Sequence, residues 1–226
     1  MKKLYFFNLL ILFIPFIATA QTQQDYSNEA VLAKRVKSLS DKYPQFVKSR
    51  ALTQTIGGKA VWMLTVGTDK ADLKPAVAVV GGVDGKHLLG VELAIGFAEK
   101  LLAASSTDSI KNLLNTQTFY VFPNMSPDAT AQYFAAVKAE RGGNATSTDD
   151  DRDGKMNEDD FDDLNGDGKI SWMRVKSPVG KYKLNNDDPR SLILADPAKG
   201  EVGGYELFAE GIDNDKDGSF HHSGRF

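Results

Sequence analysis

The chain has 226 residues, 25% of them charged, a formal net charge of −3 and no cysteine. This length allows one domain with a hydrophobic core, and the lack of cysteine excludes disulfides as its source of stability. The slightly acidic balance argues against a nucleic-acid partner, because phosphate binding requires a basic face.

The first twenty residues have the pattern of a secretory signal peptide. Residues 2 and 3 are lysines, residues 4–17 form an apolar run, and residues 18–20, Ala-Thr-Ala, form a small-residue cleavage site. A retained anchor is the alternative, although the run is short for a membrane span. We therefore expect a mature chain from about Gln21 that is secreted or periplasmic, with no membrane attachment after cleavage.

A helix and a hairpin are expected next. Ser27 can cap a helix that runs to about Tyr43, and residues 45–52 have the composition of a strand. Residues 56–59 read as a hairpin turn, and residues 60–66 as the return strand.

The middle of the chain predicts a strand, a helix and a second strand. "AVAVVGGV", residues 76–83, is wholly apolar, as in a strand buried on both faces. Residues 89–104 have the pattern of a helix, and "FYVFP", residues 119–123, that of another buried strand. This spacing favours a parallel crossover. The predicted class is therefore α/β, with a mixed, largely parallel sheet, helices on both of its faces, and acidic loop insertions.

The composition changes after Glu140. Residues 149–168 hold ten acidic and two basic residues, which alone would indicate a disordered linker. The acids alternate, however, and a glycine closes each group, so that the pattern D-x-[DN]-x-[DN]-G occurs three times. Its members are Asp149, Asp151 and Asp153, then Asp163, Asn165 and Asp167, then Asp213, Asp215 and Asp217.

Alternating acids place side-chain oxygens on one side of a tight loop. This arrangement suits calcium, which takes about six to eight oxygen ligands. The twelfth position, which is acidic in an EF-hand loop, is Asp160 in the first repeat but Arg174 in the second and Gly224 in the third. We therefore expect calcium loops inserted in another fold. The alternative is a set of solvated acidic loops.

Asp84 and His87 follow the strand predicted at residues 76–83 and precede the predicted helix. Loops at such points often carry chemistry. A carboxylate and an imidazole this close in sequence are ligands that zinc accepts. The plainer interpretation of the pair alone is a helix-capping aspartate beside a surface histidine.

Three segments, in this order, resemble the zinc carboxypeptidases of peptidase family M14. "GGVDGKHLLGVELA" stands where the family has a loop with H-x-x-E, and Asp84 and His87 fall on the histidine and glutamate positions. "VFPNMSPDA" resembles the family's P-x-x-N-P-D, with Ser126 in place of Asn. "DDLNGDGKISWMRVKSP" resembles the acidic insert of some bacterial members, and Arg174 matches the family arginine that polarises the scissile carbonyl.

The resemblance, over roughly residues 28–218, implies a zinc enzyme that hydrolyses peptide or protein substrates near a C-terminus. Zinc would activate a water, a glutamate base would take its proton, and Arg174 would stabilise the oxyanion. The family's third zinc ligand and catalytic glutamate lie farther downstream. His222-Ser223 resembles the family's H-S at the third ligand but follows the third acidic repeat too closely.

Residues 21–226 are accordingly expected to be a partial, apparently truncated domain whose sheet is incomplete on the C-terminal side. Its acidic insert is expected at about residues 144–170, and the third repeat at residues 213–218. The alternative is a secreted, calcium-binding and catalytically dead module. Asp128 is expected to tie down a loop, and Glu92 and Glu99 to face solvent or to cap neighbours.

Overall fold

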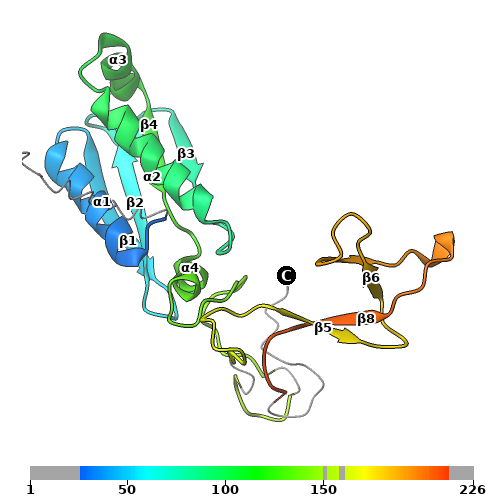
Figure 1. The fold of residues 1–226 in the computed structure, drawn as a ribbon. Helices are drawn as coiled ribbons and strands as arrows, with labels where there is room; N and C mark the ends of the chain where they lie inside the picture. The colour runs from blue at the N-terminus through cyan, green and yellow to red at the C-terminus, as the bar shows by residue number, and fades with distance from the viewer. Residues whose placement is uncertain (1–25, 150–151, 158–160, 214–226) are drawn as a thin grey trace, which may run out of the picture.

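The computed structural model describes residues 26–149, 152–157 and 161–213, so the predicted signal peptide lies outside the described residues (Figure 1). Within these ranges, no helix has the length and apolarity needed to cross a bilayer. The helices are α1 (Glu29–Lys42), α2 (Leu88–Ala103), α3 (Asp108–Thr116) and α4 (Pro127–Tyr133), with 3-10 turns η1 (Ala71–Leu73) and η2 (Pro197–Lys199). The strands are β1 (Val47–Gln54), β2 (Ala60–Val66), β3 (Ala76–Val80), β4 (Thr118–Phe122), β5 (Trp172–Lys176), β6 (Tyr182–Leu184), β7 (Leu192–Leu194) and β8 (Tyr205–Ala209).

The first sheet has the strand order β1-β2-β4-β3. β1 pairs with β2 and β2 with β4 in antiparallel fashion, whereas β3 and β4 are parallel and are connected through α2 and α3. The predicted α/β class, the mixed sheet and the parallel crossover are therefore confirmed. The sheet is mostly antiparallel rather than largely parallel, because the hairpin β1–β2 joins β4 on the side away from β3.

The core lies between this sheet and two helices that cover one of its faces (Figure 1). Leu32 and Val36 of α1 and Ile95 and Leu102 of α2 are buried against Leu64 and its neighbours in the sheet. Helical apolar spacing in α1 and α2 places their buried residues on the side that faces the sheet. β2 is buried on both faces, since Val61 and Met63 are buried as well as Leu64 and Val66. Helices had been expected on both faces of the sheet, but in the described residues they cover one face only.

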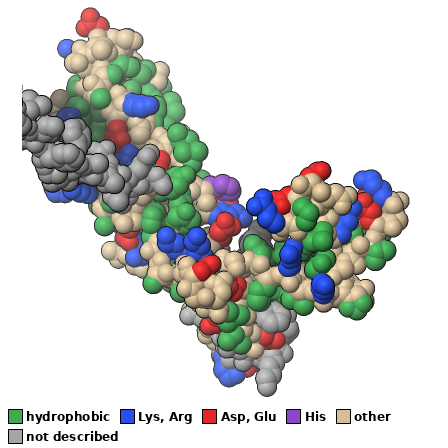
Figure 2. Space-filling model, viewed as in Figure 1, with side chains coloured by type: hydrophobic (Ala, Val, Ile, Leu, Met, Phe, Trp, Pro, Cys, Tyr) green, Lys and Arg blue, Asp and Glu red, His purple; other side chains and the backbone are tan. Residues whose placement is uncertain are grey.

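β3 differs from its sequence-based prediction. An apolar run of this length was expected to be buried on both faces, but β3 is an edge strand, and Val77 and Val80 are about half exposed. Hydrophobic side chains accordingly reach the surface over α2 and β3 (Figure 2). The apolar sequence shows that the strand suits a buried position. It does not show which neighbours cover the strand.

The second sheet has the order β5-β8-β6-β7, and its pairs are all antiparallel. The sequence did not predict this sheet, because its strands are short and three of them, β5, β6 and β8, mix polar and apolar residues. Glu210, directly after β8, is almost fully buried and accepts hydrogen bonds from the backbone N–H groups of Leu164, Asn165 and Ser171 and from the Ser171 hydroxyl. This one carboxylate therefore ties the acidic segment to the end of the second sheet.

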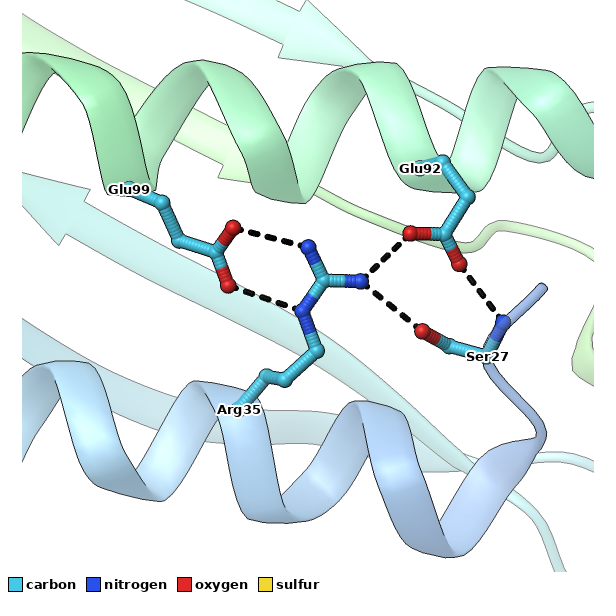
Figure 3. A network of polar contacts seen from close by, with 4 residues as sticks. All are labelled: Ser27, Arg35, Glu92 and Glu99. Carbon is cyan, nitrogen blue, oxygen red and sulfur yellow. Dashed lines mark hydrogen bonds and ion pairs between the residues drawn. The ribbon is translucent and has the colours of Figure 1, made fainter. Parts of the chain in front are cut away.

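A polar network joins α1 to α2 beside the core (Figure 3). The Arg35 guanidinium donates Nε and Nη2 to the two oxygens of Glu99, at 2.7 and 2.8 Å, and Nη1 to Glu92 and to the Ser27 hydroxyl. Glu92 and Glu99 therefore do not simply face solvent. Ser27 belongs to this network, and Asn28 caps α1 instead by accepting from Val31 N–H.

We predict that Arg35→Ala lowers the free energy of unfolding by roughly 1–3 kcal/mol, measured by urea denaturation. The substitution leaves two partly buried carboxylates without their cation. The matched control is Lys37→Ala on the same helix, where an exposed pair with Asp41 is lost and the expected change is below about 0.5 kcal/mol. Equal effects of the two substitutions would contradict the assigned role of the network.

Candidate active site

The loop between β3 and α2 lies at the carboxyl ends of the parallel strands β3 and β4. Ligand sites in α/β sheets form at this edge, because the loops that follow neighbouring parallel strands converge there. The loop runs over residues 81–87 and carries Asp84 and His87. The segment after β4, residues 123–126, lies against it.

Hydrogen bonds hold the two segments together. Gly81 N–H donates to the Phe122 carbonyl at 2.8 Å, and Met125 N–H donates to the carbonyls of Gly81 and Gly82. The Ser126 hydroxyl donates to the Val83 carbonyl at 2.6 Å. The serine that replaces the family's asparagine therefore fixes the loop one residue before Asp84.

Glycines make this close approach feasible. Gly82 has φ of +56°, and a Cβ there would lie 2.6 Å from Asn124 Oδ1. Gly85 is buried, and a Cβ at this position would overlap the side chain of Ala129 in α4. The loop is thus pressed against α4 between Asp84 and His87.

Asp128 connects α4 to other segments of the chain. Its buried carboxylate accepts from the Thr55 hydroxyl at 2.6 Å, from Gly57 N–H at 3.3 Å and from Ala145 N–H at 3.0 Å. Burial raises the pKa of Asp128, but the three hydrogen bonds outweigh this effect and the pKa lies below its ordinary value. The expectation that Asp128 ties down a loop is therefore confirmed, and the loops concerned are the β1–β2 turn and the start of the acidic segment.

The side chains of Asp84 and His87 lie against each other. Asp84 Oδ2 is 2.9 Å from His87 Nδ1, and Asp84 Oδ1 accepts from Lys86 N–H at 3.2 Å. The Lys86 N–H lowers the pKa of Asp84, partial burial opposes this, and His87 lowers it again, so that the pKa lies below its ordinary value. The His87 side chain is 74% exposed, so the pair opens to solvent.

The pair fits zinc in kind, since one imidazole and one carboxylate are ligands that catalytic zinc sites use. It is a partial set in number. Within the described ranges, no three His, Cys, Asp or Glu side chains gather as a metal site would require, and catalytic zinc takes three protein ligands. His221 and His222 lie outside the described residues.

Arg174 lies on β5 in the second sheet, where it is exposed and donates Nη1 to the Pro189 carbonyl at 3.1 Å. It makes no hydrogen bond or ion pair with Asp84 or His87, all three being described residues. The structure therefore brings Asp84 and His87 together and leaves Arg174 as a prediction.

The second acidic repeat forms a closed loop around its first aspartate. Asp163 accepts from the backbone N–H groups of Gly166, Asp167 and Gly168, at 2.7–3.1 Å, and Asn165 accepts from Asp167 N–H. Gly166 and Gly168 both have positive φ, as the predicted sharp turn requires.

The first repeat is described in part. Asp149 Oδ2 accepts from Gly154 N–H at 3.0 Å, while its Oδ1 is enclosed and has no hydrogen-bond partner among the described residues. Asp153 accepts from Lys155 N–H and pairs with its ammonium group. Of the other predicted ligands, Asp213 is described, whereas Asp151, Asp160, Asp215 and Asp217 lie outside the described residues.

Comparison with known proteins identifies the family. A sequence model described as "Zinc carboxypeptidase" matches residues 32–178, which is more than half of the chain. The chain belongs to the zinc carboxypeptidase family. Carboxypeptidase E of Caenorhabditis elegans is 26% identical over 121 residues, which is 51% of this chain and 26% of the relative. The chain thus spans about a quarter of the length of this curated relative.

Solved zinc carboxypeptidases resemble part of the chain. Bovine thrombin-activatable fibrinolysis inhibitor, in complex with tick carboxypeptidase inhibitor, matches with a TM-score of 0.48 and 14% identity over 60% of this chain and 43% of its own. A metallo-carboxypeptidase from Burkholderia cenocepacia matches with a TM-score of 0.41 and 21% identity, over 46% and 28% of the two chains.

Alanine substitutions of Gly85 and Gly96 are predicted to have opposite effects on stability, because the surroundings of the two glycines differ. Gly85→Ala is expected to destabilise the chain by roughly 1–3 kcal/mol, because the added methyl group collides with Ala129. Gly96→Ala in α2 adds a methyl group to open space and is expected to stabilise by about 0.5–1 kcal/mol through helix propensity. Urea denaturation measures both, and a neutral Gly85→Ala would show that the loop does not rest on α4 as described.

Proposed function

We propose that this protein is an exported, zinc-dependent metallocarboxypeptidase-like hydrolase that acts on peptide or protein substrates near their C-termini. The observation that carries the proposal is the contact between Asp84 and His87. The two side chains meet at the carboxyl edge of the parallel strand pair, on the positions where the family has its H-x-x-E. Membership of the zinc carboxypeptidase family supports the same reaction class.

Residues of this chain would have separate roles in metal binding and in stabilising the oxyanion. Asp84 and His87 would hold the metal, on a loop that Ser126 and α4 keep in place. Zinc, when bound, would supply Lewis acidity for water activation and carbonyl polarisation. Arg174 would offer positive charge to a developing oxyanion through the guanidinium donors that Pro189 does not use.

The remaining catalytic groups are proposed to come from outside the described residues. A third ligand and a general base are needed, and the described residues near the pair supply neither. Secretion is likewise a proposal, based on the pattern of residues 1–20.

We predict that the purified protein binds zinc near stoichiometrically after dialysis and that His87→Ala abolishes this binding, measured by atomic emission. Mass spectrometry of synthetic peptides then tests zinc-dependent release of the C-terminal residue. The control is Lys37→Ala, which alters an exposed helix position away from the loop. Zinc binding without peptide cleavage would favour the catalytically dead module, and no zinc binding would overturn the proposal.

Calcium binding by the acidic repeats is a second proposal. Two observations favour it: the enclosed Oδ1 of Asp149, which has no hydrogen-bond partner in the described part of the chain, and the closed loop around Asp163. Buried carboxylate oxygens without a hydrogen-bond donor are costly unless they are protonated or bind a cation.

We predict that millimolar calcium raises the melting temperature of the protein, because a ligand that binds only the folded state stabilises it. Asp163→Ala is expected to reduce the calcium-induced shift, whereas Asp187→Ala, which alters an acid outside the repeats, is expected to leave it unchanged. An equal shift in all three proteins, or none in the unsubstituted one, would favour solvated acidic loops.

A further inference from the structure

The acidic segment, residues 144–170, and the loop that carries Asp84 and His87 both contact α4. We propose that calcium binding at the first acidic repeat holds the start of α4 in place and thereby stabilises this loop, so that calcium regulates the candidate active site from a distance. The inference rests on the proposed calcium binding and names the site that this binding regulates. It does not depend on a metal at the pair.

The first acidic repeat is attached to the start of α4. Ala145 N–H donates to Asp128 Oδ2 at 3.0 Å, and Asp128 is the second residue of the helix. The chain around Asp149 is closed into a loop, because Asn157 N–H donates to the Thr148 carbonyl at 2.9 Å and Thr148 N–H donates to Asn157 Oδ1 at 3.1 Å. A cation held by Asp149 in this loop therefore constrains a segment that bonds directly to α4.

The second acidic repeat is attached beyond the end of α4. Lys138 N–H donates to the Gly168 carbonyl at 3.0 Å, and Ile170 N–H donates to the Lys138 carbonyl at 2.8 Å. Three backbone N–H groups close this repeat around Asp163. In Figure 1, α4 accordingly lies between the first sheet and the acidic segment. The chain after α4 is thus fixed by its own contacts, and the start of α4 is the end that the first repeat controls.

The start of α4 also supports the loop that carries the pair. Ala129 is buried, and a Cβ at Gly85 would lie 2.1 Å from its side chain. The Ser126 hydroxyl, directly before α4, donates to the Val83 carbonyl at 2.6 Å. A displacement at the start of α4 therefore removes the contacts on which residues 83–87 rest.

The closed form of the first repeat is unfavourable without a cation. Residues 149–168 hold ten acidic and two basic residues, and repulsion between like charges favours an open segment. Asp149 Oδ1 is enclosed and has no hydrogen-bond donor within the described ranges. Calcium that binds only the closed form shifts the equilibrium toward it, and with it toward the hydrogen bond between Ala145 and Asp128.

Hydrogen exchange with and without calcium tests the inference. The reporters are the amides of Lys86 and His87, which donate to Asp84, and that of Met125, which donates to the Gly81 carbonyl. Calcium at a concentration that saturates binding, established by titration calorimetry, is expected to slow their exchange by about 5-fold or more. The amides of α3, at the opposite end of the first sheet from α4, are expected to stay unchanged (Figure 1).

Two variants separate the regulation from calcium binding itself. Ala145→Pro has no N–H to donate to Asp128 and keeps every acid of the repeats, so it is expected to lose the slowing at the reporters. The matched control is Ala145→Ser, which keeps the N–H and is expected to keep the slowing. Asp149→Asn, which removes the charge of the enclosed carboxylate, is expected to abolish the slowing as well.

Calorimetry and exchange together distinguish the two ways to fail. Calcium binding with unchanged exchange at the reporters would overturn the regulation and leave the calcium proposal standing. Slowing that persists in Ala145→Pro or in Asp149→Asn would also overturn it. If the unsubstituted protein binds no calcium, the calcium proposal fails and the regulation fails with it.

Discussion

The structure around the candidate site depends on one constraint, which is the close approach of two loops at the carboxyl ends of β3 and β4. Parallel pairing of these strands brings the loops to the same edge, and glycines at 81 and 82 let their backbones come together. The hydrogen bonds from Met125 and Ser126 become available only at that separation. The orientation of Asp84 and His87 follows from this packing.

Buried carboxylates connect segments of this chain that are distant in sequence. Asp128 and Glu210 are both almost fully buried, and each accepts several hydrogen bonds from segments that are distant in sequence. Hydrogen bonds from Ser171 lower the pKa of Glu210, so its charge is favoured where burial alone would oppose it. Hydrogen bonds from backbone N–H groups can stabilise a buried carboxylate that has no cation beside it.

Local patterns predicted much of the first part of the chain. The strand expected at residues 60–66 has those bounds, and the helix expected at 89–104 is shifted by one residue. Strand direction was less predictable, because residues 45–52 and 76–83 show how apolar each segment is but not which strand lies beside it. The short strands of the second sheet gave no periodic signal, since three residues are too few to establish one.

Position and residue type selected Asp84 and His87 as candidate metal ligands, because a carboxylate and an imidazole at a strand-to-helix loop are chemically distinctive. Their role as ligands stays a prediction, whereas the packing around them was not predictable from the sequence. The contact between Asp84 and His87 spans three residues within one loop. The contact of Gly85 with Ala129 in α4, and that of Asp128 with the β1–β2 turn, join segments far apart in sequence, so no local pattern contains them.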